Sequence, residues 1–361
     1  MLLKNSMKFV LPLIGFVCAS CLVLGCGDES SSTGPAPVAL SSSSAMLNPA
    51  SSSLVGTPIE NVNTSSSVTS NLSSMDTPLS SDGALVVSSS TVPVYPPVNK
   101  VVNLGITPDV DGFYDVGDVY KAVPATSKLV FVLRHAEREK STKQESKLTE
   151  TGVMQAQSVG AKLAGGDESF YYSSTDFIRT RETCNNIAIG RGETSYETVT
   201  WDGINGDYFL KVPSDTFDLW ADRAGKDSWS VISMWAYNVQ DVPAKVAAVI
   251  PVAFYDLMSR GDQFVHEVVL ANLPNWKRVS VLATHDVLVA PLIIYASDRA
   301  VDLRFYDYSI GRWANYLSGV AVIVDENNSP SILPVRGIDL GYLLSPRKQK
   351  ELDSLAAMAA Q

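Results

Sequence analysis

Two apolar runs of strand length stand out in the second part of the chain. They are Lys128–Leu133 and Val279–Ala283, and both are continuous and rich in β-branched residues. This pattern is typical of strands that are buried on both faces of a parallel sheet. A third, shorter strand is expected over Phe170–Ser173.

Helical stretches lie between and after these strands. Thr149 is a suitable N-cap for the first helix, and Asp176 is expected to open the second. Because strands and helices alternate, the pattern predicts an α/β fold, a three-layer α/β/α sandwich with a mostly parallel central sheet. The helical stretches span Thr149–Leu163, Ile178–Ile189, Val242–Met258 and Val287–Tyr295.

The last part of the chain predicts a hairpin and a final helix. Two apolar segments, Leu317–Val324 and Ile332–Val335, flank the turn-rich stretch Asp325–Pro330, so a hairpin is expected at a sheet edge. Ser345 and Pro346 then suit the start of a helix over Arg347–Ala360, because proline is favoured in a first helical turn.

The first hundred residues have a different composition. Residues 27–99 contain no Lys or Arg, and serines occur there in runs. No apolar period of a strand or helix survives, so we predict a disordered Ser/Pro-rich linker over residues 27–100. Residues 101–361 are expected to form one folded domain.

The amino terminus has the features of a secretion signal. Lys4 and Lys8 precede an apolar run, Phe9–Leu24, that is too short to cross a ~30 Å hydrocarbon core. Its end, Leu-Val-Leu-Gly-Cys26, resembles a bacterial lipobox. We therefore predict a lipoprotein signal peptide over residues 1–26, lipidation at Cys26, and a protein anchored in the cell envelope that faces the periplasm or the cell exterior. An ordinary secretory signal, an uncleaved anchor and lipidation at Cys21 are the alternatives.

Charge and cysteine content narrow the classes of protein. With 28 Lys+Arg against 38 Asp+Glu the formal net charge is -10, which argues against a nucleic-acid partner. Three of the four cysteines fall within the first 26 residues, so a disulfide framework is excluded. Cys184 is expected to be a small buried apolar residue.

Candidate chemistry gathers where the predicted strands end. Arg134 and His135 follow the first long strand, while His285 and Asp286 follow the second, and the carboxyl ends of parallel strands form the ligand crevice of an open α/β sheet. Arg179 lies in the first turn of the next helix. Guanidinium groups repel a metal dication but match a tetrahedral anion, so the pattern predicts a phosphate site with no metal and no cofactor.

These residues resemble a known family. Leu133-Arg134-His135-Ala136-Glu137 is similar to the Arg-His-Gly signature of the histidine phosphatase superfamily, the phosphoglycerate mutase-like and acid phosphatase-like fold. The resemblance covers roughly Lys128–Val324 and leaves the linker aside. Further pieces in the same order are Leu148-Thr149-x-x-Gly152-x-x-Gln155-Ala156, Ser173-Ser174, Arg179-Thr180-Arg181-Glu182-Thr183 and His285.

The resemblance implies roles for the site residues. His135 would be the nucleophile that forms a phosphohistidine, and Arg134, Arg179 and His285 would bind the phosphoryl oxygens. Asp286 would be the general acid, as in the acid phosphatase branch. Its alternatives are Glu137, Asp202 and Asp207.

Two departures from the family pattern bear on the activity. Ala136 replaces the usual glycine. The segment Arg138-Glu139-Lys140-Ser141 lacks the Trp-Asn pattern of phosphoglycerate mutases, which argues against mutase activity. We predict a phosphomonoester hydrolase that acts on a phosphorylated small molecule or a phosphoprotein. The alternative is a non-catalytic surface lipoprotein that binds phosphate or a phospho-ligand. The aromatic segment Tyr196–Tyr237 could cap the pocket or pack as a subdomain.

Overall fold

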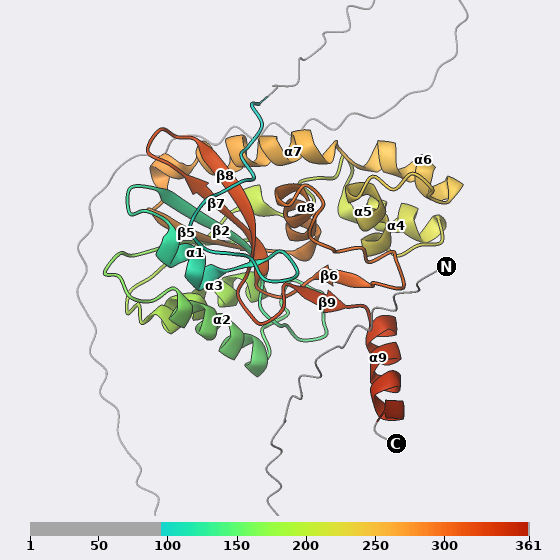
Figure 1. The fold of residues 1–361 in the computed structure, drawn as a ribbon, viewed down its shortest axis with the longest axis horizontal. Helices are drawn as coiled ribbons and strands as arrows, with labels where there is room; N and C mark the ends of the chain where they lie inside the picture. The colour runs from blue at the N-terminus through green and yellow to red at the C-terminus, as the bar shows by residue number, and fades with distance from the viewer. Residues whose placement is uncertain (1–94, 360–361) are drawn as a thin grey trace, which may run out of the picture. The chain divides into compact units, whose positions relative to one another are not determined.

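The central sheet arranges its strands in the order β1-β8-β7-β2-β5-β3-β4 within the part of the chain that the computed structural model describes, residues 95–359 (Figure 1). The predicted signal peptide, Cys26 and residues 27–94 of the predicted linker lie outside the described residues. The strands are β1 (Tyr114–Asp115), β2 (Lys128–Arg134), β3 (Tyr171–Ser174), β4 (Thr198–Thr200), β5 (Val279–Thr284), β7 (Ser318–Val324) and β8 (Pro330–Arg336).

Parallel pairing dominates this sheet. Strands β2, β5, β3 and β4 pair in parallel, and β8 pairs in parallel with β1. Among the described strands of the sheet only β7 is reversed, because it is antiparallel to both of its neighbours, β2 and β8. A separate antiparallel pair is formed by β6 (Arg312–Ala314) and β9 (Tyr342–Leu344).

Helices cover both faces of the sheet, which confirms the predicted α/β/α layers (Figure 1). One face carries α1 (Val116–Ala122), α2 (Glu150–Lys162) and α3 (Ile178–Arg191). The other carries α4 (Ser214–Arg223), α5 (Ser228–Ala236), α6 (Ala244–Ala253), α7 (Leu257–Gln263) and α8 (Asp286–Ala296). The last helix, α9 (Pro346–Ala359), has no buried residue and projects from the domain (Figure 1).

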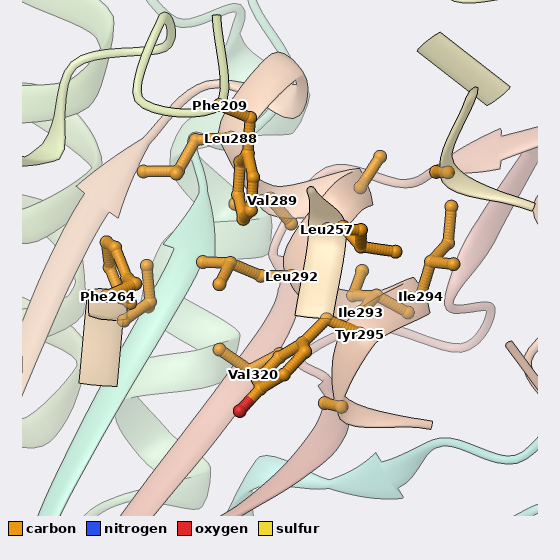
Figure 2. Close-up of a cluster of buried hydrophobic side chains, with 14 of the residues drawn as sticks. Phe209, Leu257, Phe264, Leu288, Val289, Leu292, Ile293, Ile294, Tyr295 and Val320 are labelled. Atoms are coloured by element: carbon orange, nitrogen blue, oxygen red, sulfur yellow. The ribbon is translucent and has the colours of Figure 1, made fainter. Parts of the chain in front are cut away.

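Alternation along β2 divides the core into two clusters. Leu129, Phe131 and Leu133 pack against the layer of α2 and α3, while Val130 and Val132 face α8. Helix α8 is buried along its length from Leu288 to Ala296, as expected for a helix that is apolar on every side. Figure 2 shows its side chains packed with neighbours from other elements, including Phe209, Phe264 and Val320.

The long strands and most of the helices lie where the sequence pattern predicts them. Thr149 is the N-cap of α2, and its hydroxyl accepts a hydrogen bond from the Gly152 amide. The predicted C-terminal helix corresponds to α9, and Cys184 is fully buried.

Three details of the predicted elements are wrong. Asp176 does not cap α3, whose N-cap is Phe177 without a side-chain bond, because the Asp176 carboxylate accepts from Gln144 instead. The predicted helix 242–258 divides into α6 and α7, since the Asp256 carboxylate caps a new helix. The hairpin β7–β8 is not at the edge, because β7 pairs with β2 and β1 covers β8.

Residues 95–100 contact the folded domain. The Val98 side chain is buried, and the Tyr95 ring stacks on His266 at 5.0 Å. His266 Nε2 is 3.1 Å from the Pro96 carbonyl oxygen. The packing of the domain thus reaches at least to Tyr95. Among the described helices, none combines the length and hydropathy that a membrane span requires.

Candidate active site

Four charged or polar side chains converge at the carboxyl edge of the sheet. Arg134 ends β2 and is followed by His135, while His285 follows β5. Arg179 reaches them from the first turn of α3. All four are buried, with exposed fractions of 4%, 2%, 8% and 6% for Arg134, His135, His285 and Arg179. The structure therefore brings together the residues that the sequence places at strand ends.

The imidazole of His135 has one nitrogen bound to the backbone and one facing a guanidinium. Nδ1 lies 2.8 Å from the Ala136 carbonyl oxygen, which can only accept, so Nδ1 carries the proton. Nε2 accepts a hydrogen bond from Arg179 Nε at 3.2 Å. Burial, followed by the charge of Arg134, holds the pKa of His135 well below its usual value. The ring is neutral, with the lone pair of Nε2 directed to the arginine.

His285 is neutral for the same reasons. Its Nδ1 lies 3.4 Å from Arg179 Nη2, and its Nε2 lies 3.1 Å from Thr175 Oγ1. Because a guanidinium only donates, Nδ1 accepts and Nε2 carries the proton. Burial and the charge of Arg179 lower the pKa of His285 to about 3. Phe177 meets the ring edge-on at 4.6 Å and fixes its plane.

The guanidinium of Arg134 is held on one side and free on the other. Nη1 donates to the Ala314 carbonyl oxygen at 2.7 Å, and Nη2 lies 3.2 Å from Asp286 Oδ2. The group stacks over the Tyr316 ring at 4.3 Å. Its buried Nε has no hydrogen-bond partner among the described residues. Because buried donors are nearly always hydrogen-bonded, this Nε is available to a bound ligand or water.

Asp286 is the first residue of α8 and is bound by two donors. Trp313 Nε1 donates to its Oδ2 at 3.1 Å, and Arg134 lies beside the same oxygen. Burial raises the pKa of this carboxyl, but the charge of Arg134 and the bond from Trp313 outweigh burial and leave the pKa lowered. The carboxylate is therefore ionised at neutral pH in the free protein.

The motif residues that resemble the family, on α2 and α3, contact the loop that follows His135. Thr149 Oγ1 donates to the Glu137 carboxylate at 2.8 Å, and Gln155 Oε1 accepts from the Glu137 amide at 3.1 Å. A Cβ at Gly152 would lie 2.0 Å from the Glu137 carbonyl oxygen, so only glycine allows α2 to approach. Thr183 Oγ1 accepts from the Ala136 amide at 3.0 Å. These contacts fix the loop that carries His135.

A cavity of about 510 Å³, here called the active-site cavity, opens over these groups. Arg138 lies in its wall, as do Asp207 and Asp286, whereas Glu137 and Asp202 do not. Two of the four candidate acids thus face the cavity. Its remaining lining residues are Arg134, His135, Thr142, Asp176, Phe177, Arg179, Asn205, Gly206, Ser214, Asp218, Trp229, His285 and Val287.

Sequence reasoning missed the segment that supports Arg134 and Asp286. Trp313, Ala314 and Tyr316 belong to β6 and the turn that follows it, and each contacts one of these two residues. The only available signal was a tryptophan and a tyrosine close together in a polar stretch after the last predicted parallel strand. The aromatic segment 196–237 has a double role, because Trp229 lines the active-site cavity while Phe217 and Trp235 are buried in the core.

Within residues 95–359, no group of three or more His, Cys, Asp or Glu side chains is arranged to hold a metal ion. Arg179 supplies positive charge in its place: burial and the neighbouring Arg138 lower its pKa only to about 10, so it is charged at neutral pH.

Comparison with known families gives a match to this region. Residues 130–303 match the model of the histidine phosphatase superfamily (branch 1). The match contains Arg134, His135, Arg179 and His285. The domain that these residues form is a member of the histidine phosphatase superfamily. A comparison with curated proteins gives no match.

Solved structures of low sequence identity are also similar to this chain. One is phosphoglycerate mutase from Bacillus anthracis str. Sterne, with 17% identity, a TM-score of 0.39, and coverage of 58% of this chain and 93% of the other. Another is the mycobacterial glucosyl-3-phosphoglycerate phosphatase, with 15% identity, a TM-score of 0.35, and coverage of 59% and 100%. The protein histidine phosphatase SixA in complex with tungstate has 11% identity, a TM-score of 0.33, and coverage of 58% and 97%.

Proposed function

We propose that this protein is a phosphomonoester hydrolase that works through a phosphohistidine at His135. Members of its superfamily are phosphatases or mutases. The observation that carries the proposal is the hydrogen bond from Arg179 Nε to His135 Nε2 at 3.2 Å. It aligns an unprotonated nucleophile with a donor suited to a phosphoryl oxygen, and Arg134, whose Nε has no partner among the described residues, lines the same cavity.

The reaction would proceed in two displacements. The Nε2 lone pair of His135 attacks phosphorus, the bond between phosphorus and the ester oxygen breaks, and the departing alcohol takes a proton from a general acid. Arg134 and Arg179 neutralise the phosphoryl oxygens, and His285 donates to them after a change of tautomer. A water molecule then attacks phosphorus, gives its proton to the same acid group and releases inorganic phosphate and neutral His135.

Asp286 is our proposed acid, with Asp207 as the alternative that also faces the cavity. Asp286 is ionised in the free protein because Arg134 lies beside it. A bound phosphate dianion would offset that positive charge and raise the pKa of the carboxyl. Asp286 would therefore take up a proton from solvent when the substrate binds.

We also propose that Cys26 carries a lipid and that the domain acts outside the cytoplasm, in the cell envelope. The support is the sequence alone: Leu-Val-Leu-Gly-Cys26 behind an apolar run. Residues 27–94 would then separate the anchored cysteine from the domain.

A direct assay tests the hydrolase proposal. The purified full-length chain should release phosphate from a chromogenic aryl phosphate, and rapid acid-free denaturation during turnover should trap acid-labile phosphate on the protein. His135→Ala should lose activity by several orders of magnitude and trap none. His266→Ala serves as the matched control, because His266 lies outside the active-site cavity, and it should keep full activity.

The alternative function is a binding protein for a phosphorylated ligand. Phosphate binding by the wild type, measured by calorimetry, together with no turnover of any phosphomonoester would favour that function. Turnover that survives in His135→Ala would contradict the phosphohistidine mechanism.

A further inference from the structure

A smaller, mostly apolar pocket between α4, α5 and α8 adjoins the active-site cavity. We call this pocket the apolar annex. Four residues, Gly206, Ser214, Asp218 and Val287, line both spaces, so the two are neighbours. The deeper wall of the annex is formed by Phe209, Phe217, Ile232, Trp235, Phe254 and Pro291.

The deeper wall of the annex is built of packed aromatic rings, and its polar side chains, Ser214 and Asp218, lie on the side shared with the active-site cavity. Trp235 stacks on Phe254 at 4.4 Å, and Phe217 meets Phe254 edge-on at 5.0 Å. The indole N–H of Trp235 is already donated to the Tyr255 carbonyl oxygen at 3.1 Å. A polar group that entered would lose its bonds to water without replacement, which is unfavourable. The chemistry of the wall therefore selects an apolar group.

Gly206 lies at the boundary of the two spaces and packs closely against Val287. A Cβ built on Gly206 would lie 2.4 Å from Val287 Cγ2 and 3.8 Å from His285 Cβ. This boundary thus lies beside one of the histidines of the phosphate site. Any larger residue at position 206 would press on Val287, which lines both spaces.

The size of the annex limits its occupant. Its volume is about 70 Å³, well below the roughly 150 Å³ of a dry cavity that holds a benzene ring. A short alkyl chain fits this space. Asp218 lines both spaces, and its carboxylate disfavours a second anionic group near the annex, whereas Arg138 lies in the wall of the active-site cavity.

We infer that the alcohol part of the substrate carries a short, uncharged alkyl chain that enters the apolar annex while the phosphate lies between Arg134 and Arg179. This inference rests on the proposed hydrolase function. It names the substrate class as alkyl monophosphates rather than bisphosphates or phosphorylated acids.

A homologous series of substrates tests the inference on the full-length chain. Ethyl, propyl and butyl phosphate share nearly the same leaving-group basicity, so differences in kcat/KM report on binding of the chain. Each methylene that enters the annex should raise kcat/KM about three- to fourfold, and the gain should stop once the annex is full. A butyl phosphate with a terminal carboxylate should be the poorer substrate.

Variants of the annex wall locate the effect. Ile232→Phe fills the annex and should bring the ratio of kcat/KM for butyl over ethyl phosphate close to one. Phe217→Leu enlarges the annex and should move the optimum to longer chains. Val252→Phe adds the same ring on α6, where Val252 is 52% exposed, and should keep the wild-type ratio.

The outcomes separate this inference from the proposed function. Hydrolysis of all three esters with equal kcat/KM would overturn the inference and leave the hydrolase intact. No hydrolysis of any phosphomonoester would overturn both. If Ile232→Phe fails to fold, the wild-type series and Phe217→Leu still decide, and a butyl preference that survives in Phe217→Leu without a shift to longer chains would contradict a role for the annex.

Discussion

The guanidinium of Arg179 donates its Nε–H to Nε2 of His135 at 3.2 Å. An arginine in this position keeps Nε2 free of a proton, because two positive charges would face each other if the imidazole were protonated. In the proposed mechanism, a phosphoryl oxygen would lie next to this guanidinium when Nε2 attacks phosphorus. One residue would then both prepare the nucleophile and bind the group that it attacks.

Removal of this arginine should affect catalysis more than folding. We expect Arg179→Gln to lower kcat/KM by about 10²–10³-fold, the loss that follows removal of one transition-state donor. Arg179→Lys should recover little, since an ammonium cannot reproduce the planar array of donors. Steady-state kinetics with an aryl phosphate measure both effects. Near-normal kinetics in Arg179→Gln would rule out this role.

The general acid can be identified from leaving-group dependence. If Asp286 protonates the alcohol, Asp286→Asn should cost most with alkyl phosphates and least with activated aryl phosphates, because a good leaving group departs without a proton. A plot of log kcat/KM against leaving-group pKa measures the slope. Asp207→Asn is the matched variant in the same cavity. A steeper slope in Asp207→Asn alone would assign the role to Asp207.

Acid should destabilise the folded domain through its two site histidines. Burial lowers the pKa of both His135 and His285, the latter to about 3, whereas an unfolded histidine titrates near ~6.5. Below pH ~6.5 the unfolded chain binds more protons than the folded chain. The free energy of unfolding therefore decreases as the pH decreases, by up to about 1.4 kcal/mol per pH unit for each histidine. The contribution of the two histidines to stability is fully present above pH ~6.5.

Urea unfolding at a series of pH values measures this effect. The wild type should lose stability between about pH 6.5 and pH 4, and the double variant His135→Gln, His285→Gln should show a shallower dependence. Equal slopes for the two proteins would mean that other groups cause the acid sensitivity.

The contact of α2 with the loop after His135 predicts an effect at Gly152. Because a Cβ would lie 2.0 Å from the Glu137 carbonyl oxygen, Gly152→Ala should destabilise the domain by about 1–3 kcal/mol. Activity should fall as well, since the shift moves the loop that holds His135. Thermal unfolding and kinetics measure the two effects. Gly166→Ala is the control, because its Cβ would meet only side-chain atoms, the nearest being the Tyr120 hydroxyl at 3.1 Å, and it should change neither.

The proposed attachment of the protein to the membrane depends on Cys26. Cys26→Ser should move the protein out of the membrane fraction without a change in the activity of the folded domain, because a thiol is needed for the lipid. Fractionation and an immunoblot measure this. Full retention of the variant in the membrane fraction would favour an uncleaved apolar helix as the anchor.

The main features of the fold and site could be predicted because they depend on short-range pattern and topology. Strands β2 and β5 are continuous apolar runs, and residues that follow parallel strands must meet at one edge. Arg134, His135 and His285 therefore come together as expected. Thr149 was identifiable as a cap because its hydrogen bond spans only three residues.

The features that escaped prediction depend on contacts between distant segments. The break between α6 and α7 lies in a largely apolar stretch, and its signals are Pro251 near the end of α6 and the cap at Asp256. The link from Trp313 to Asp286 joins residues 27 positions apart, and no periodicity reports such a pair. The apolar annex arises in the same way, from three helices whose relative placement the sequence pattern does not reveal.

The hairpin strand β7 has a consequence for how this chain can be cut or recombined. Residues 130–303 match the superfamily, yet β7 pairs with β2 along Lys128–Leu133, and the Leu317 amide donates to the Arg134 carbonyl oxygen. A fragment that stopped at residue 303 would open one side of β2 and deprive Arg134 and Asp286 of Ala314 and Trp313. The segment that must fold together thus extends beyond the residues that match the superfamily. A chimera with a related domain must exchange the C-terminal hairpin together with the catalytic strands to remain intact.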